Sequence, residues 1–174
     1  MQLINLPLRK DDLIEQGNNS FYRDQSGKRA VKNEVPEARV IDGHGIENDG
    51  HGGDWGRQVT CLNWQSVLKA NQEHNLNIGP GQFAENIAID GMDFSRLTVG
   101  SRFKLGENVI FEVSQVGKED HPSVVTRTYG VSLLPSEGLF CRVISGGVFI
   151  KGTRWNRCRI LMTACSPGWS FKWQ

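Results

Sequence analysis

Glycine is the feature that most constrains this chain, because it divides the sequence into short segments. The chain of 174 residues contains 20 glycines, about 11% against a typical value of about 7%. Glycine also occupies six of the fourteen positions from 43 to 56, a density that neither a helix nor a strand tolerates. We therefore expect a shaped loop at 43–56 and, elsewhere, short strands joined by tight turns.

Several segments have the length and the boundaries of short strands. In the clearest, residues 109–116, Val109, Phe111 and Val113 alternate with more polar neighbours, which is the period of a half-buried strand. One helix is predicted over residues 63–74, with Asn63 as a suitable N-cap. Further strands are expected at 38–41, 57–62, 86–89, 101–105, 140–145, 147–151 and 157–162. The pattern predicts a mainly β fold, a mostly antiparallel β-barrel with few helices.

We expect residues 1–174 to form a single domain, because no repeat, linker or change of composition divides them. Residues 16–37 are polar, are broken by glycine and proline, and show no apolar period, so they are predicted to form a long loop or arm. The carboxyl-terminal segment contains Trp169 and Trp173. We expect it to be a packing tail.

Charge and composition exclude several classes of protein. The 20 Lys and Arg residues against 19 Asp and Glu residues leave a net charge of +1, so we expect no binding to nucleic acid or to an anionic membrane. The amino end lacks the continuous apolar stretch of a signal peptide, which favours a cytoplasmic protein. The four cysteines are far apart in the sequence, so neither structural zinc nor a disulfide framework is expected.

Four polar clusters contain the residues that could carry chemistry. The glycine-rich loop supplies acids, bases and a following arginine, the KEDH segment follows the strongest strand, and GQFAEN and PSEGLFCR are the other two clusters. Separate polar clusters in a small barrel are simply explained by one shared pocket. The candidate binding residues are His44, Asp49, His51, Arg57, Phe83, Asn86, Lys118, Glu137 and Arg142. The candidate catalytic residues are Asp120, His121 and His51.

Each cluster also has a purely structural interpretation. Asp and Asn in glycine-rich loops commonly bind their own backbone, and the histidines lack the spacing of a known metal motif, so no metal site is predicted. Arg57, Glu85 and Arg142 can form ion pairs that tie loops to the barrel instead of binding a ligand. Cys61 and Cys141 are expected to be small buried apolar residues rather than nucleophiles.

Three motifs in a particular order carry a resemblance to a known family. The runs GHGIENDGHGGDWGRQVTCL, GQFAENIAIDGMDFSRLTVGSRFKLGENVIFEVSQVGKEDH and PSEGLFCRVISGGVFIKG resemble the MOSC domain family, named after the carboxy-terminal domain of molybdenum cofactor sulfurase. The resemblance covers about residues 31–153 and is greatest to short, stand-alone bacterial members. It implies a β-barrel like the barrel domain of pyruvate kinase. It also implies a role in binding molybdenum cofactor, molybdenum or, at family level, pyridoxal phosphate, or in handling sulfur.

The chain departs from such relatives at positions that bear on function. Asp120 stands where they have the cysteine of K-E-C-H, and Val124 and Ser132 lie in a stretch where further cysteines are replaced. A carboxylate is a hard oxygen donor and forms no persulfide, so sulfur-carrier chemistry at residue 120 is excluded. Asn48 stands where the family loop usually has glycine before the aspartate. Asparagine accepts left-handed backbone geometry, so the loop is expected to form.

These observations favour a MOSC-like protein that binds molybdenum cofactor (molybdopterin) or a related small anionic ligand without carrying sulfur. Two alternatives stay open. One is an enzyme that uses a metal, or histidine and aspartate, to act on a small molecule. The other is a degenerate, non-catalytic copy of the domain. The oligomeric state and any turnover are not indicated by the sequence.

Overall fold

The structure is a computed structural model that describes residues 20–23, 32–121, 123–152 and 155–156. Its strands are β1 (Ser20–Arg23), β2 (Asn33–Val35), β3 (Glu37–Ile41), β4 (Gly45–Ile46), β5 (Val59–Asn63), β6 (Ile87–Ile89), β7 (Arg102–Leu105), β8 (Val109–Val116), β9 (Leu139–Ser145), β10 (Gly147–Ile150) and β11 (Trp155–Asn156). Its helices are α1 (Trp64–His74), the 3-10 helix η2 (Phe94–Arg96), α2 (Val124–Tyr129) and α3 (Leu134–Glu137).

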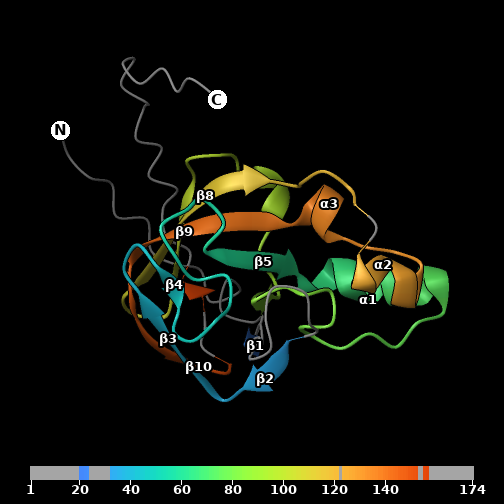
Figure 1. The fold of residues 1–174 in the computed structure, drawn as a ribbon, viewed down its shortest axis with the longest axis horizontal. Coiled ribbons are helices and arrows are strands. Elements are labelled where there is room, and N and C mark those ends of the chain that lie inside the picture. Colours follow the sequence, from blue (N-terminus) through green and yellow to red (C-terminus); the bar gives the residue numbers. More distant parts are fainter. Residues whose placement is uncertain (1–19, 24–31, 122, 153–154, 157–174) are drawn as a thin grey trace, which may run out of the picture.

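The main sheet has eight strands in the order β11-β7-β8-β9-β5-β6-β1-β2. It curls so that its middle strands β8, β9 and β5 cross the centre of the molecule (Figure 1). All of its pairs are antiparallel except β5 with β6, where the chain returns through α1 and the following loop to a parallel position. A second sheet, β10-β3-β4, is antiparallel, and the chain enters it from β9 through Gly146.

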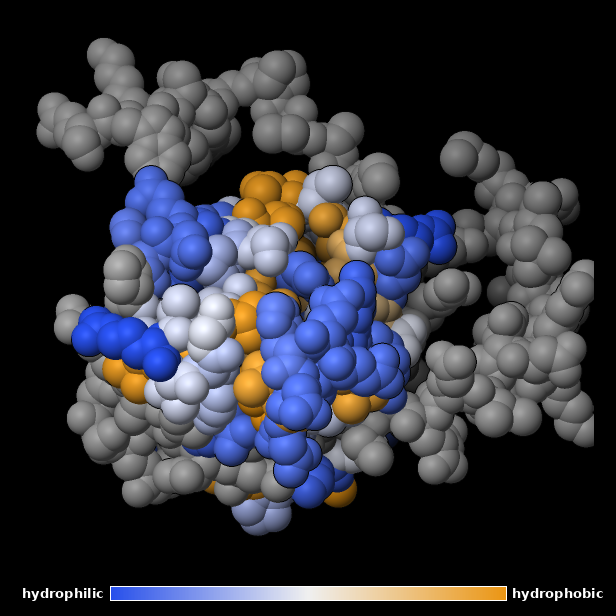
Figure 2. All heavy atoms as spheres, turned by 90° about the vertical axis from the view of Figure 1, so that its right-hand side faces the viewer, coloured by the Kyte–Doolittle hydropathy of each residue, from blue (hydrophilic) through white to orange (hydrophobic). Residues whose placement is uncertain are grey.

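Two apolar clusters pack on the sheets. The larger one is enclosed by the curled sheet and the second sheet, with fully buried side chains such as Phe111 and Leu105. The smaller one lies between β5 and the helices, where Leu62 packs with Val67 of α1, Val125 of α2 and Leu134 of α3. The helices therefore cover one end of the sheet (Figure 1). Figure 2 views that end, where hydrophobic atoms lie between hydrophilic patches.

The predicted mainly β architecture with few helices is confirmed. The predicted strand at 109–116 has the expected bounds, and α1 begins after Asn63, whose side chain accepts a hydrogen bond from the Gln65 amide as an N-cap. The described part of the main sheet is an open, curled sheet in which one internal pair is parallel.

Two sequence-based expectations about local structure were wrong. Residues 16–37 were expected to be a loop, yet they contain β1 and β2, which pair with each other while β1 also pairs with β6. Helices α2 and α3 were not predicted, because helices of four to six residues are too short to show an apolar period. The predicted strand at 157–162 and the tail with Trp169 and Trp173 lie outside the described residues. Within the part of the chain that is described, no helix has the length and apolarity needed to span a membrane.

Candidate functional site

A buried polar network joins the glycine-rich loop to the GQFAEN segment. Asp49 Oδ2 accepts hydrogen bonds from Lys32 Nζ at 2.9 Å and from Asn86 Nδ2 at 3.0 Å. Asp49 Oδ1 accepts one from the backbone N–H of His51 at 2.9 Å. The two segments, joined by residues 37 apart in sequence, thus meet at Asp49, where the contact is buried inside the protein.

The charge on Asp49 is strongly stabilised. Burial alone would raise its pKa, but the hydrogen bonds from His51 and the positive charge of Lys32 outweigh burial and hold the pKa well below its ordinary value. The Lys32 and Asp49 side chains are 1% and 0% exposed. Breaking such a buried pair by removing one partner is costly, so Asp49 is an organiser of the loop.

The histidines of the loop lie near Asp49 and near a glycine. His51 Nδ1 is 3.4 Å from Asp49 Oδ1, and the His51 ring stacks on Trp55 with ring centroids 6.5 Å apart. The exposed His44 packs against Gly52, where an added Cβ would lie 2.5 Å from His44 Nε2. Glycine at position 52 therefore lets the loop close onto His44.

Glu85 is a second buried carboxyl group in the GQFAEN segment. It is 0% exposed, and its Oε1 accepts a hydrogen bond from the Gly81 amide at 2.6 Å. Burial raises its pKa, and backbone donors together with Lys32 oppose that rise without cancelling it. The ion pair that ties a loop to the barrel is thus formed by Asp49 and Lys32 and not, as was expected, by Glu85. Glu85 instead binds the backbone of its own turn.

The glycine-rich loop ends at Arg57, which lies on the surface of β8 and β9. Its Nε donates to Gln115 Oε1 at 2.9 Å, and its guanidinium carbon lies 5.1 Å from the centroid of the Phe140 ring. The loop is fastened beside it, because Ser114 Oγ lies within hydrogen-bond distance of the Gly56 carbonyl and, at 2.9 Å, of the Phe140 carbonyl, which share its one O–H donor. Arg57 is half-buried and its position is set by three strand residues.

Lys118 approaches Arg57 from the end of β8. Its backbone N–H donates to the Pro135 carbonyl at 2.9 Å, which ties the strand end to α3. Burial lowers the pKa of Lys118 and the neighbouring Arg57 lowers it further, against an opposing effect of Asp120. The Arg57 and Lys118 side chains, from distant parts of the sequence, therefore lie in one half-buried cationic site.

Gly117 makes this approach feasible. Its φ is +65°, and a Cβ there would lie 2.5 Å from the Pro135 carbonyl oxygen. Glycine adopts this left-handed conformation at no steric cost. The turn that presents Lys118 therefore depends on the absence of a side chain.

Asp120 and His121, the candidate catalytic residues beside Lys118, are both exposed. His121 Nε2 lies 3.3 Å from Glu119 Oε2 on the surface. Asp120 is therefore not enclosed in a pocket. The structure offers no contact that would make either residue part of catalytic machinery.

Three other candidates lie away from these clusters. Phe83 is 0% exposed and packs against Tyr129 in the core under the helices, so it cannot contact a ligand. Glu137 is exposed at the end of α3. Arg142 is exposed on β9 opposite Glu112.

The cysteines within the described residues are structural, as predicted. Cys61 and Cys141 are both 0% exposed and lie in the main core. Burial raises the pKa of the Cys141 thiol well above its ordinary value, and the adjacent Cys61 raises it further. A thiol in this environment is a poor nucleophile. Among the described residues, no three of His, Cys, Asp and Glu are grouped so as to hold a metal ion.

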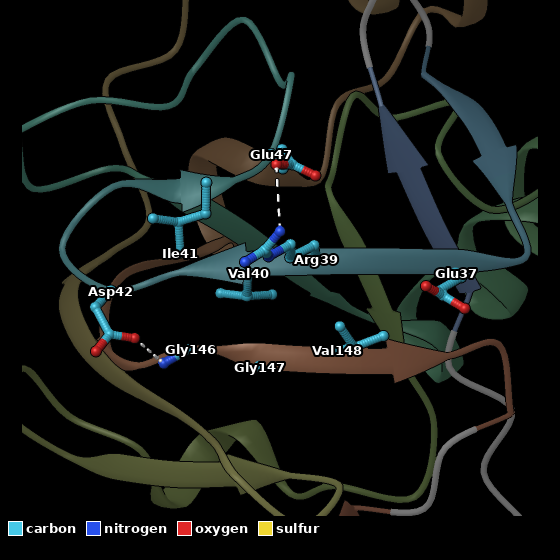
Figure 3. Close-up of a pocket in the computed structure, with 9 residues that line it drawn as sticks. All are labelled: Glu37, Arg39, Val40, Ile41, Asp42, Glu47, Gly146, Gly147 and Val148. Atoms are coloured by element: carbon cyan, nitrogen blue, oxygen red, sulfur yellow. Dashed lines mark hydrogen bonds and ion pairs between the residues drawn. The ribbon is translucent and has the colours of Figure 1, made fainter.

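A groove lies on the second sheet, away from the predicted residues. It has a volume of about 710 Å³, and Figure 3 shows that its lining comes from β3, from β10 and from the residues that follow β3 and β4 or precede β10. Arg39 and Glu47 approach within 4.0 Å across it, and Asp42 accepts a hydrogen bond from the Gly146 amide. None of the candidate site residues lines this groove.

The predicted clusters therefore meet in two places. Asp49, His51 and Asn86 form the buried network, and Arg57 and Lys118 form the half-buried cationic site. Sequence reasoning missed Lys32, Gln115 and Phe140. Lys32 is one of several basic residues in a polar segment, with nothing to set it apart from Lys28 and Arg29. Gln115 and Phe140 belong to strands whose facing only the tertiary structure defines, so the sequence carries no signal for any of the three.

Comparison with known proteins agrees with this architecture. Residues 47–118 match the model of the MOSC domain, from the glycine-rich loop to Lys118. The match confirms, over these residues, the resemblance to the MOSC domain family that the three motifs predicted. No curated protein sequence matches the chain.

Solved structures share the fold at low sequence identity. The YUAD protein from Bacillus subtilis is 18% identical with a TM-score of 0.62, over 79% of this chain and 93% of that one. YiiM from Escherichia coli is 19% identical with a TM-score of 0.58, over 83% and 72%. YiiM from Geobacillus stearothermophilus is 17% identical with a TM-score of 0.59, over 78% and 71%. These similarities show the fold.

Proposed function

We propose that the cationic site of Arg57 and Lys118 binds the phosphate of a small molecule, and that the protein is a binding rather than a sulfur-carrying MOSC protein. One observation carries the proposal. Two positively charged side chains, 61 positions apart in the numbering, are both half-buried and are brought together by Gln115, which bonds to Arg57 and to the Gly117 carbonyl next to Lys118. Within the described residues, neither forms an ion pair with a carboxylate.

The physical reason is electrostatic. Like charges that are brought together away from bulk water repel each other. The pKa of Lys118 is lowered first by burial and further by the neighbouring Arg57. A bound phosphate removes the repulsion, because an arginine fork and a lysine ammonium are the side chains that hold phosphate oxygens. The site is therefore poised for an anion.

Molybdenum cofactor is the first ligand to test, because the MOSC domain family is associated with it and its pterin carries a phosphate. The donor set at Arg57 and Lys118 fits the phosphate. Among the described residues it is not accompanied by an accessible thiol, since residue 120 is an exposed carboxylate and Cys61 and Cys141 are buried. Arg57 and Lys118 would hold the cofactor, and the cofactor would supply redox-active molybdenum.

Calorimetric titration tests this proposal with inorganic phosphate and a pterin phosphate as probes. We expect Arg57→Gln and Lys118→Gln each to weaken binding roughly tenfold or more, the effect of one charge-assisted contact. Lys69→Gln, which removes one exposed positive charge on α1, is the matched control and should leave binding unchanged. Equal affinities in all three variants, or no binding by the natural protein, would favour the degenerate-copy alternative.

A further inference from the structure

The side chain of Gln115 contacts Arg57 at one end and the turn before Lys118 at the other. Its Oε1 accepts from Arg57 Nε at 2.9 Å, and its Nε2 donates to the Gly117 carbonyl at 2.7 Å. An amide has an acceptor end and a donor end. Because the acceptor end meets a donor and the donor end meets an acceptor, the side-chain amide of Gln115 has one favourable orientation.

A β-bulge places Gln115 at this position. The register of β8 with β9 pairs Val113 with Cys141 and Gln115 with Phe140, so Ser114 is the extra residue. Strict alternation along β8 would put residue 115 on the same side as the buried Phe111 and Val113. The bulge instead turns Gln115 to the side of Phe140, under Arg57. Bulges are known to re-aim side chains in this way near functional sites.

The consequence for Arg57 follows from how its donors are used. Arginine has five N–H donors in a fixed plane, and Gln115 occupies the one on Nε. The Phe140 ring lies against the guanidinium carbon, 5.1 Å from centroid to carbon. Among the described residues no hydrogen bond to the terminal nitrogens of Arg57 is found. The terminal fork is therefore held in one orientation with its donors open.

We propose that Gln115 is a positioning residue that fixes the Arg57 fork for two-point binding of a tetrahedral oxyanion, a phosphomonoester group. This inference rests on the proposed function. It adds the residue that makes the cationic site selective for a tetrahedral oxyanion. Gln115 itself does not need to contact the anion. It acts by linking the orientation of Arg57 to the Gly117 turn that carries Lys118.

Two substitutions and a double-mutant cycle test the proposal. Gln115→Met keeps the side-chain length and removes both polar ends, and we expect it to weaken inorganic phosphate binding roughly tenfold. Gln115→Glu places a negative charge beside Arg57 and should weaken phosphate binding further. In an Arg57→Lys background, which has no Nε–H fork, Gln115→Met should have almost no additional effect, because its action passes through Arg57. Gln72→Met at an exposed position of α1 is the matched control.

Spectroscopy supplies a readout that a purely structural role would not change. In the natural protein the Arg57 Nε–H resonance should be sharp and should shift when phosphate is added. In Gln115→Met it should broaden or disappear at unchanged thermal stability. If Gln115→Met does not fold, the phosphate affinity of Gln115→Glu, compared with that of the natural protein, still tests the positioning role.

The outcomes separate the two proposals. If Arg57→Gln abolishes phosphate binding while Gln115→Met and Gln115→Glu both bind as the natural protein does, the positioning role is wrong and the anion site stands. If phosphate does not bind to the natural protein, both proposals fail. If Gln115→Met weakens binding by the same factor in the natural background and in the Arg57→Lys background, the residue does not act through Arg57, and the positioning role is also overturned.

Discussion

At the scale of single residues, Asn48 shows how a departure from the family pattern is tolerated. The residue stands where related loops usually have glycine, and its φ is +59°, within the left-handed region that asparagine accepts. We expect Asn48→Gly to change the free energy of unfolding by less than about 0.5 kcal/mol and Asn48→Ala to lower it by about 1 kcal/mol. Urea unfolding of both variants measures the difference. Equal stability of the alanine variant would contradict the backbone argument.

Asp49 makes a pH-dependent contribution to stability. Its pKa is lowered in the folded protein, so its contribution is complete above the unfolded value of about 3.9 and is lost as the pH falls toward the lower folded value. Asp49→Asn leaves Lys32 without this buried partner and should cost about 3–5 kcal/mol at pH 7.

The difference in stability between the natural protein and Asp49→Asn should therefore narrow as the pH is lowered below about 4. Urea unfolding at several pH values measures it. Glu73→Gln is the control, because it breaks the exposed pair with Lys69 and should cost less than about 0.5 kcal/mol at any pH. A difference that stays constant down to the acid limit would show that Asp49 is not charged in the folded state.

Lys118 predicts a pH dependence for anion binding. Its pKa is lowered by burial and by Arg57. As the pH rises, the free protein therefore loses the charge on Lys118 at a lower pH than the usual pKa of about 10.4. A bound anion favours the charged form. Binding of inorganic phosphate should therefore weaken as the pH rises from neutral toward that value, and Lys118→Gln should flatten this part of the profile. The same slope in Lys118→Gln would exclude Lys118 as the titrating group.

At the scale of elements, the contact between the turn after β8 and α3 depends on one glycine. Gly117 and Gly130 both have left-handed φ values, +65° and +75°, but only at Gly117 would a Cβ meet a neighbour, the Pro135 carbonyl oxygen. Gly130→Ala should cost about 1 kcal/mol for the backbone conformation alone. Gly117→Ala should cost clearly more and should also weaken phosphate binding, because the clash displaces Lys118.

Thermal unfolding and phosphate titration of the two variants make the comparison. The excess cost of Gly117→Ala over Gly130→Ala reports the close contact, since both variants carry the same backbone penalty. Identical stabilities would mean that the turn can move away from α3 without loss.

At the scale of the whole molecule, the expectation that this protein does not carry sulfur can be tested. Residue 120 is an exposed aspartate, and Cys61 and Cys141 are buried. After incubation with a persulfide-loaded cysteine desulfurase, we expect peptide mass spectrometry to find no added sulfur on Cys61 or Cys141. In Asp120→Cys the exposed thiolate attacks the terminal sulfur of the donor persulfide, the donor S–S bond breaks, and the donor leaves as a thiolate. The peptide with residue 120 should then gain one sulfur atom.

A sulfur atom on Cys141 of the natural protein would overturn this expectation, since it would require the core to open. Absence of added sulfur in Asp120→Cys, with the fold unchanged, would mean that the strand end no longer receives a donor. Phosphate binding by the same variant controls for an intact cationic site.

Local sequence determined much of this molecule. Glycines and short alternating apolar runs define where strands begin and end, because these effects act over a few residues, and Asn63 caps α1 for the same reason. The chemistry at residue 120 also follows directly from its identity. The order of the motifs was sufficient to indicate the resemblance to the MOSC domain family, which the match over residues 47–118 confirms.

Tertiary structure decided which of the polar residues meet. The pairing of β8 with β9 introduces a bulge that reverses the facing of Gln115, and a reversal of that kind depends on the partner strand rather than on the alternation within β8. Lys32 finds Asp49 through a long-range contact, and Phe83 is directed into the core by α2. Burial and charge at a site are sums over segments distant in sequence, so the cationic pair of Arg57 and Lys118 exists only once the sheet has formed.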